Sequence, residues 1–212
     1  LETRKRVETI TLDLNAGYIN LVPKLFPNAK VVVDRFHIVQ MMNRVVNQLR
    51  IQTMNTLDKK STQYKFMKHE WKQFLRPWSK LEHTTKRYHH SVGYYETDVN
   101  LVTECLAIDS NFQAAYDVYQ GLLEALQNHD QLAFTKQLRQ YRPLHNKLDT
   151  TIKTFRKYRK QVLNAVTSPY SNGYLEGVIG RIKKIKNTAY GYRNWWHFID
   201  RIRLQLVWLR TA

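Results

Sequence analysis

Cysteine is almost missing from this sequence, and its scarcity excludes two kinds of site. The chain of 212 residues has one cysteine, Cys105. It can therefore form no internal disulfide and no zinc site built on several thiolates. Cys105 lies among apolar neighbours in VNLVTECLAI, so we expect a small core residue and not a nucleophile.

Long apolar runs are missing as well. The sequence has no stretch of about 18 apolar residues and no signal-peptide pattern, so nothing predicts a membrane span or export. We expect a cytoplasmic protein with no membrane partner. The hydrophobic content of 43% is enough for a sizeable core, in one large domain or in a domain with an insertion. Because the chain opens with Leu1 and not Met, we also expect a part of a longer protein.

Acidic residues are few compared with basic ones. The chain has 34 Lys and Arg against 17 Asp and Glu, which gives a formal net charge of +17. Such an excess attracts polyanions, because each neutralised phosphate releases condensed counterions. Nucleic acid is therefore the first partner to consider.

The first sixty residues have an α/β pattern. Val7–Leu14 alternates apolar and polar residues, Ala16–Leu25 is typical of a short helix, and Lys30–Phe36 is typical of a fully buried strand. Strand, helix and strand in this order predict a parallel pair. The functional crevice of a parallel sheet lies at the carboxyl ends of its strands, where Asp13 and Asp34 are expected.

Helical spacing dominates the next part of the chain. Ile38–Leu57 predicts one long amphipathic helix, and Lys80–Glu96 is expected to be a loop or mobile segment. Further helices are predicted over about 63–75, 98–108, 112–126, 131–141 and 144–166. The fold class is therefore mostly α, with a small parallel β remnant.

The segment Lys80–Glu96 contains three histidines that do not predict a metal site. His83, His89 and His90 have no Asp or Cys nearby that completes a recognisable ligand set. We expect them to face solvent or phosphate. Tyrosines interleaved with basic residues in the same segment can stack on exposed bases, although ordinary packing is the alternative. These are Tyr88, Tyr94 and Tyr95, with Lys86 and Arg87.

A late basic helix begins in SNGYLEGVIGRIKKIKN. Glu176 lies in its first turn, which Ser171 or Asn172 can cap, and the helix carries only positive charge beyond Glu176. The apolar residues predict one buried stripe: Leu175, Val178, Ile179, Ile182 and Ile185. The charge pattern suggests a metal-binding acid beside a phosphate-binding face. A first-turn glutamate favoured only by the helix dipole is the ordinary alternative.

Three phrases together resemble the DDE transposases of bacterial insertion sequences, in the ISL-three group. They are ITLDL, FPNAKVVVDRFHIV and SNGYLEGVIGRIKKIKNTAYGYRNWWHFIDRIR, and the resemblance runs from about Val7 to Leu209. It implies an RNase H-like catalytic domain. Asp13 resembles the second catalytic Asp and Glu176 the catalytic Glu, whereas Asp34 and His37 resemble a D-x-x-H pair near the site.

The same resemblance implies how the chain is divided. Residues 1–58 would be a partial RNase H-like core, 59–167 a large all-helical insertion, and 168–212 the return of the catalytic-Glu helix and a basic helix. The first catalytic Asp of the family has no counterpart here, so we expect a C-terminal fragment that is inactive alone.

In this family the chemistry is DNA strand cleavage and transfer during transposition. Asp13 and Glu176 would hold Mg²⁺ or Mn²⁺, because these hard cations prefer oxygen ligands. The partners would be transposon ends and target DNA, with a possible homo-oligomer. Phosphate contacts are expected from Arg181, Lys183, Lys184, Lys186, Arg193, Arg201 and Arg203. Trp195 and Trp196 are expected to be core aromatics.

Two other functions stay open at this point. The first is a non-catalytic basic helical protein that binds nucleic acid, and the second is a helical scaffold for another protein. Loss of divalent-metal binding in Asp13→Ala and Glu176→Ala would separate the transposase from both. A steep dependence of DNA affinity on salt would separate the two alternatives from each other.

Overall fold

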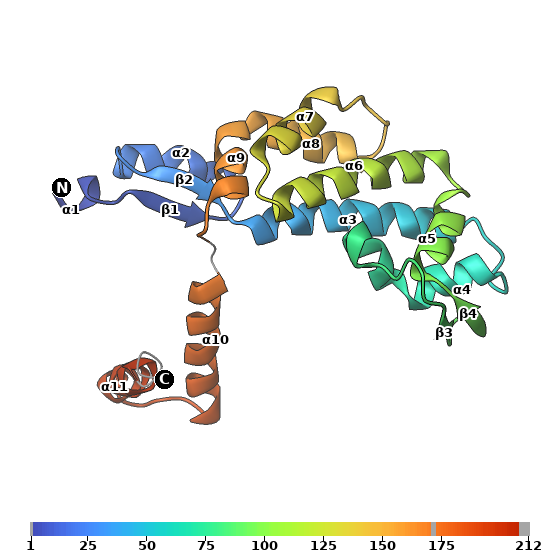
Figure 1. Cartoon of the computed structure of the whole chain (residues 1–212). Helices are drawn as coiled ribbons and strands as arrows, with labels where there is room; N and C mark the ends of the chain where they lie inside the picture. Colours follow the sequence, from blue (N-terminus) through green and yellow to red (C-terminus); the bar gives the residue numbers. More distant parts are fainter. Residues whose placement is uncertain (1, 171–172, 208–212) are drawn as a thin grey trace. The chain divides into compact units, whose positions relative to one another are not determined.

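The computed structural model describes residues 2–170 and 173–207, which form two compact units divided after Pro169 (Figure 1). The first unit contains all four described strands and most of the helices, and the second contains the last two helices. The proposed caps Ser171 and Asn172 lie outside the described residues. The mostly helical fold with a small parallel sheet is confirmed.

The parallel pair forms where the sequence predicts it. After a short helix α1 (Glu2–Lys5), strand β1 (Thr9–Leu12) pairs in parallel with β2 (Lys30–Val33), and α2 (Ala16–Leu25) connects them. Both strands are shorter than predicted. The residues after Val33 begin a helix because Asp34 caps its first turn.

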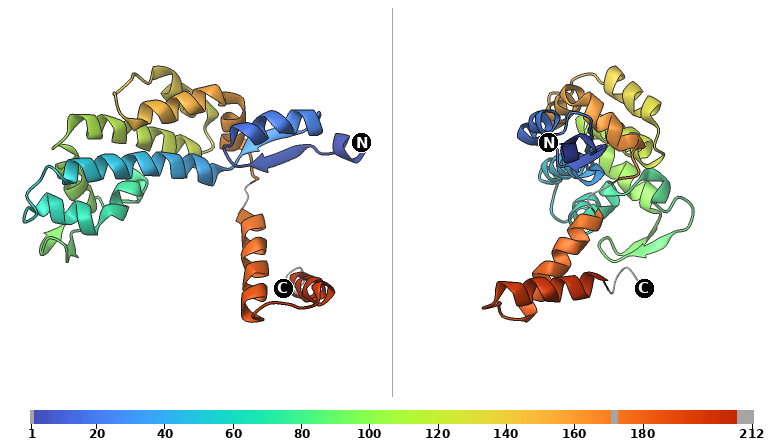
Figure 2. Two further views of the ribbon diagram at one scale, coloured as in Figure 1. Left: turned by 180° about the vertical axis from the view of Figure 1, so that it is seen from behind. Right: turned by 90° about the vertical axis from the view of Figure 1, so that its left-hand side faces the viewer.

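Helix α3 (Arg35–Met54) is the longest element of the first unit. Its buried residues recur with helical spacing: Ile38, Met42, Val45, Val46 and Leu49. It lies beside α6 (Ser110–Gln127) in Figure 1 and in the left view of Figure 2. This pair forms the centre of the unit.

Shorter elements follow α3 and surround the pair. They are α4 (Thr62–His69), the 3₁₀ turns η1 (Trp71–Leu75) and η2 (Trp78–Lys80), strands β3 (Arg87–His89) and β4 (Tyr94–Glu96), α5 (Asp98–Leu106), α7 (Gln131–Gln140), α8 (Lys147–Lys157) and α9 (Arg159–Thr167). Polar side chains accept a hydrogen bond from the first turn of most of these α-helices, which fixes where they begin. The caps are Ser61, Thr97, Asp130 and Asn146, and Asp109 does the same for α6.

Three sequence predictions need correction here. The helix expected over 144–166 is two helices that meet at Tyr158. No Gly or Pro marks this break, so periodicity alone predicts one helix. The helix expected over 63–75 changes to a 3₁₀ turn after Glu70. The segment Lys80–Glu96 is not a loop throughout, because it contains the antiparallel hairpin β3–β4.

The helical region returns to the parallel strands. Helix α9 contacts β2, and Asn164 Nδ2 donates a hydrogen bond of 2.7 Å to the Val31 carbonyl oxygen. The core is continuous from the strands to the helices, and it includes the large buried rings of Phe66, Phe74, Phe112, Phe134 and Phe155. Cys105 is buried in it as predicted, and burial raises the pKa of its thiol to about 12.

The second unit has two helices, α10 (Gly173–Thr188) and α11 (Trp195–Val207), which contact each other. Ile185 is buried, but Leu175 and Ile179 are 56% and 42% exposed. The expectation of one buried stripe is therefore wrong for these two positions. Two helices offer too little surface to cover all their apolar side chains.

The tryptophans of the second unit also differ from expectation. Trp195 and Trp196 are 64% and 65% exposed, and so they are not core aromatics. The Trp195 ring does meet Phe198, with 5.7 Å between centroids. No helix that the structure describes, in either unit, has the length and apolar character needed to cross a membrane.

Candidate metal and DNA-binding residues

Two aspartates lie at the carboxyl ends of the parallel strands. Asp13 follows β1 and Asp34 follows β2, and the last paired residues of the ladder are Leu12 and Val33. The Asp34 backbone N–H donates to the Leu12 carbonyl oxygen at 2.9 Å, which continues the ladder by one step. The parallel pairing thus places both acids at the same edge of the sheet.

Asp13 is joined to a histidine of the first turn of α3. His37 Nε2 lies 2.8 Å from Asp13 Oδ1, and the two side chains are 26% and 55% exposed. A carboxylate oxygen of Asp34 and a ring nitrogen of His37 lie within 4.8 Å of each other. One imidazole therefore lies beside both acids at this edge.

Asp34 has a structural task that explains its position. It is 2% exposed, and its Oδ1 accepts a 3.1 Å hydrogen bond from the Phe36 N–H. This contact caps α3 and favours the sharp change from strand to helix. Asp13 is half exposed, so of the two acids it is the one with access to a ligand from solvent.

The remaining predicted site residues belong to the second unit. Glu176 is the fourth residue of α10 and is exposed. Seven residues, about two helical turns, separate it from Lys183, so both lie on the same side of the helix. The other predicted phosphate contacts are exposed as well: Arg181, Lys184, Lys186, Arg193, Arg201 and Arg203. Arg203 forms an exposed ion pair with Asp200 at 3.5 Å. The convergence of Asp13 and Glu176 stays a prediction.

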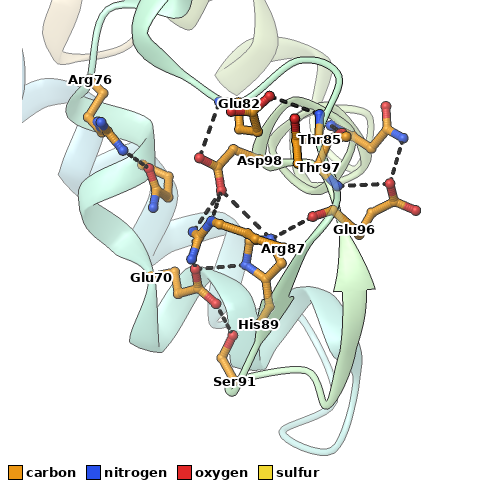
Figure 3. Close-up of polar contacts among 12 residues, drawn as sticks. Glu70, Arg76, Glu82, Thr85, Arg87, His89, Ser91, Glu96, Thr97 and Asp98 are labelled. Atoms are coloured by element: carbon orange, nitrogen blue, oxygen red, sulfur yellow. Dashed lines mark hydrogen bonds and ion pairs between the residues drawn. The ribbon is translucent and has the colours of Figure 1, made fainter.

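A second acid–histidine cluster lies in the first unit, beneath the β3–β4 hairpin (Figure 3). His89 Nδ1 lies 2.9 Å from Glu70 Oε2, and its Nε2 lies 3.0 Å from the Glu96 carbonyl oxygen and 3.7 Å from Asp98 Oδ1. Arg87 reaches Glu70 at 2.9 Å and Asp98 at 2.7 Å. We call Glu70, Arg87, His89 and Asp98 the hairpin cluster.

The hairpin cluster has the residue types of a metal site but is filled by its own cation. Ligand atoms of Glu70, His89 and Asp98 lie within 4.8 Å of one another. The Arg87 guanidinium bonds both carboxylates, and the Ser91 hydroxyl donates to Glu70 Oε1. A metal ion would have to displace these bonds, so the arrangement is that of an ion-pair network.

The network also shifts the acid–base properties of its members. Burial alone would raise the pKa of Glu70, but the hydrogen bonds from Ser91 and His89 and the charges of His89 and Arg87 lower it. Burial lowers the pKa of Arg87, and its bonds to Asp98 and Glu70 outweigh that effect, so the pKa is raised. The charged forms of both partners are stabilised together.

Sequence reasoning missed this cluster. The prediction that His89 faces solvent or phosphate is wrong, because His89 is 1% exposed. Its acids were overlooked because Glu70 is nineteen residues before it and Asp98 nine residues after it. A signal was present in the alternation of Arg87 and His89 with Tyr88, followed by Gly93, a pattern typical of a hairpin.

Comparison with known proteins adds to this geometry. A family model described as Transposase, for DDE transposases of the ISL3 type, matches residues 1–202. The chain belongs to this transposase family. The resemblance predicted from the three sequence phrases is confirmed.

Two curated relatives match the chain. A transposase for insertion sequence element IS1001 from Bordetella parapertussis is 24% identical over 206 residues, which are 94% of this chain and 47% of that protein. A protein of Lactococcus lactis subsp. lactis named ATP-dependent protease is 32% identical over 109 residues, 51% of this chain and 35% of that protein. The chain spans about half or less of the length of these relatives. No solved structure matches it significantly.

Proposed function

We propose that this chain is part of the catalytic domain of a transposase that cleaves and joins DNA with a divalent metal. The observation that carries the proposal is Asp13, a half-exposed carboxylate at a strand end that is hydrogen-bonded to His37, in a chain of the ISL3 transposase family. The strand end is where ligands bind in parallel sheets.

The residues present suit Mg²⁺ or Mn²⁺. These ions prefer carboxylate oxygens and keep several waters, so a few acids suffice. Asp13 and Glu176 would supply them, and Asp34 would remain the cap of α3. In this family, divalent ions would supply activation of the attacking oxygen and stabilisation of the leaving oxygen at phosphorus.

The protein's own groups have separate tasks in this proposal. The His37 ring holds Asp13 Oδ1 at 2.8 Å, which orients the carboxylate towards its ligand. The basic side chains of α10 and α11 neutralise DNA phosphates and position the strand without selecting its sequence. Glu176 and Lys183 lie on one side of α10. Glu176 would bind the metal, and Lys183 would contact a phosphate of the same DNA strand.

The same family membership predicts how the chain is divided, whether it is active alone, and where it acts. Residues 1–58, 59–167 and 168–212 would be the core, the helical insertion and the returning catalytic helix. Because only Asp13 and Glu176 match two of three catalytic positions, we expect the 212-residue chain to be inactive alone. A cytoplasmic location and self-association on DNA are further predictions.

The alternative functions are less well supported. The name ATP-dependent protease belongs to a relative that matches 51% of the chain, whereas the transposase family covers residues 1–202. A non-catalytic DNA-binding protein would need the basic residues but not Asp13 or Glu176. A helical scaffold would need neither set.

Strand cleavage tests the catalytic role. A polypeptide extended by its upstream coding sequence should cleave and join DNA carrying transposon ends with Mg²⁺ or Mn²⁺. Asp13→Asn and Glu176→Gln should each lower the rate by about a hundredfold or more, because metal-based charge stabilisation contributes several kcal/mol. Asp58→Asn, at an exposed turn, is the control. Full activity in Asp13→Asn would exclude the proposal.

Duplex binding tests the basic helix separately. Replacing Lys183, Lys184 or Lys186 by Ala should weaken binding to unrelated duplexes about equally. Each replacement should also lower the salt slope by about 0.9. An affinity that responds to neither salt nor these changes would favour the scaffold.

A further inference from the structure

The β3–β4 hairpin has two chemically different faces. In the register, Tyr88 pairs with Tyr95, and His89 pairs with Tyr94. Because successive side chains of a strand point to opposite faces, Arg87 and His89 enter the hairpin cluster, whereas Tyr88 lies on the other face with Tyr95. His89 is buried while Tyr88 and Tyr95 are 42% and 65% exposed.

Three rings meet on the exposed face. The Tyr88 ring lies 5.2 Å from that of Tyr95 and 5.0 Å from that of His90, in edge-on arrangements of 61° and 85°. In an edge-on pair the edge of one ring covers only part of the face of the other, and the exposed parts of Tyr88 and Tyr95 remain available to a ligand. We call Tyr88, His90 and Tyr95 the aromatic face.

A cationic hollow adjoins the aromatic face. It has a volume of about 610 Å³, and its lining includes Tyr88 and His90 together with Lys65, His69 and Arg87. Its one acid, Glu70, is already bonded to Arg87, His89 and Ser91. Arg87 is in turn neutralised by Glu70 and Asp98, so Lys65 supplies the positive charge beside the rings.

The hairpin cluster holds this surface in place. Strands of three residues are too short to be stable by themselves, but here the inward side chains are fixed by buried charged partners. Asp98 and His89 side chains are 4% and 0% exposed. The backbone that carries the exposed rings is therefore held in place. A ligand that binds the rings loses little affinity to the conformational entropy of ordering them.

We propose that the aromatic face binds a nucleic-acid strand with unpaired bases, stacking a base on Tyr88 or Tyr95 with a neighbouring phosphate in the hollow beside Lys65. A paired base has both flat sides stacked on its neighbours, so only an unpaired base can cover a ring. Rings next to cations are the combination that binds single strands. The inference rests on the proposed function only in that DNA is the ligand, because it requires no metal.

The test uses the 212-residue chain with a fluorescein-labelled thymidine oligonucleotide in EDTA, followed by fluorescence anisotropy. Tyr88→Ala and Tyr95→Ala should each weaken binding about five- to hundredfold. Tyr88→Phe and Tyr95→Phe, which keep the ring, should retain affinity. Lys65→Ala should lower the salt slope by about 0.7. Tyr18→Ala removes an exposed tyrosine of α2 and is the matched control.

The outcomes separate this inference from the proposed function. Equal losses on a duplex, an equal loss in Tyr18→Ala, or unchanged affinity in both alanine variants would each overturn the aromatic face as a single-strand site. Duplex binding that still depends on Lys183 would then leave the transposase proposal standing. Selective loss on the single strand supports the inference even if Asp13→Asn leaves cleavage intact.

Discussion

The first unit contains two acid–histidine clusters that differ in burial. At the strand ends, Asp13 is 55% exposed and is held by His37. In the hairpin cluster, Asp98 is 4% exposed and is bonded by Arg87, with His89 also close. Similar residue types therefore make an accessible carboxylate in one place and a closed network in the other.

This difference shows why residue type alone does not identify a metal site. A carboxylate can bind an ion only if its oxygens are accessible and no fixed cation already neutralises it. Arg87 fills that role in the hairpin cluster. Asp13 differs in that about half of its side chain is open to an ion from solution. Substitutions should therefore affect stability at one cluster and metal binding at the other.

The largest expected effect is on folding stability. Asp98→Ala should lower the free energy of unfolding by about 1–3 kcal/mol, because Arg87 loses one of its two carboxylates and the Glu82 N–H loses its acceptor. Asp13→Ala should cost less than about 1 kcal/mol, since that side chain is half exposed. Urea denaturation measures both. Equal losses would mean that the two clusters do not differ in kind.

The fold was predictable where hydrophobic periodicity and turn chemistry agree. Strand β1, helix α2, strand β2 and the long α3 appear close to their expected positions because each has a clear period. The break at Tyr158 and the hairpin β3–β4 were missed. Nothing in local composition marks the first, and the second depends on partners that are distant in sequence, Glu70 and Asp98.

The candidate site was predictable only in part. The ITLDL phrase and the position at a strand end indicate Asp13. The helix that begins at Arg35 places His37 in its first turn, beside Asp13. The buried role of Asp34 as a cap was not visible, because a DRFH phrase does not show which acid is enclosed. Likewise the sequence shows that Trp195 and Trp196 are large and apolar, but not whether enough surface is available to cover them.

A smaller effect is expected on metal affinity. Asp13→Asn should weaken Mn²⁺ binding by at least about tenfold, because loss of even a supporting ligand contact costs that much. Selective ¹³C labelling of histidine rings reports it: Mn²⁺ should broaden the His37 signal at low concentration and leave His89 sharp. His37→Gln assigns the signal.

The matched control for this measurement is Glu70→Gln. It removes a carboxylate of the hairpin cluster and should not change the Mn²⁺ concentration that broadens His37. If His89 broadens first, Mn²⁺ displaces Arg87 from its two carboxylates, and the contrast between the clusters is lost.

The smallest expected effect is a dependence of stability on pH from Glu70. Its pKa is lower in the folded chain than the ordinary 4.5, so the unfolded chain binds more protons in this range. Stability from Glu70 is then complete above about pH 5 and declines as pH falls through the folded pKa, by at most about 1.4 kcal/mol per pH unit.

Glu70→Gln should flatten the decline in urea midpoints between pH 5 and 3. Ser91→Ala removes one hydrogen bond that lowers this pKa, so the folded pKa moves closer to the ordinary value, and the decline should be smaller and should end at higher pH. The opposite result is that the urea midpoints of Ser91→Ala match those of the unsubstituted chain at every pH, while Glu70→Gln shows the same decline with falling pH. That result would mean that the network does not control the acid sensitivity of the hairpin.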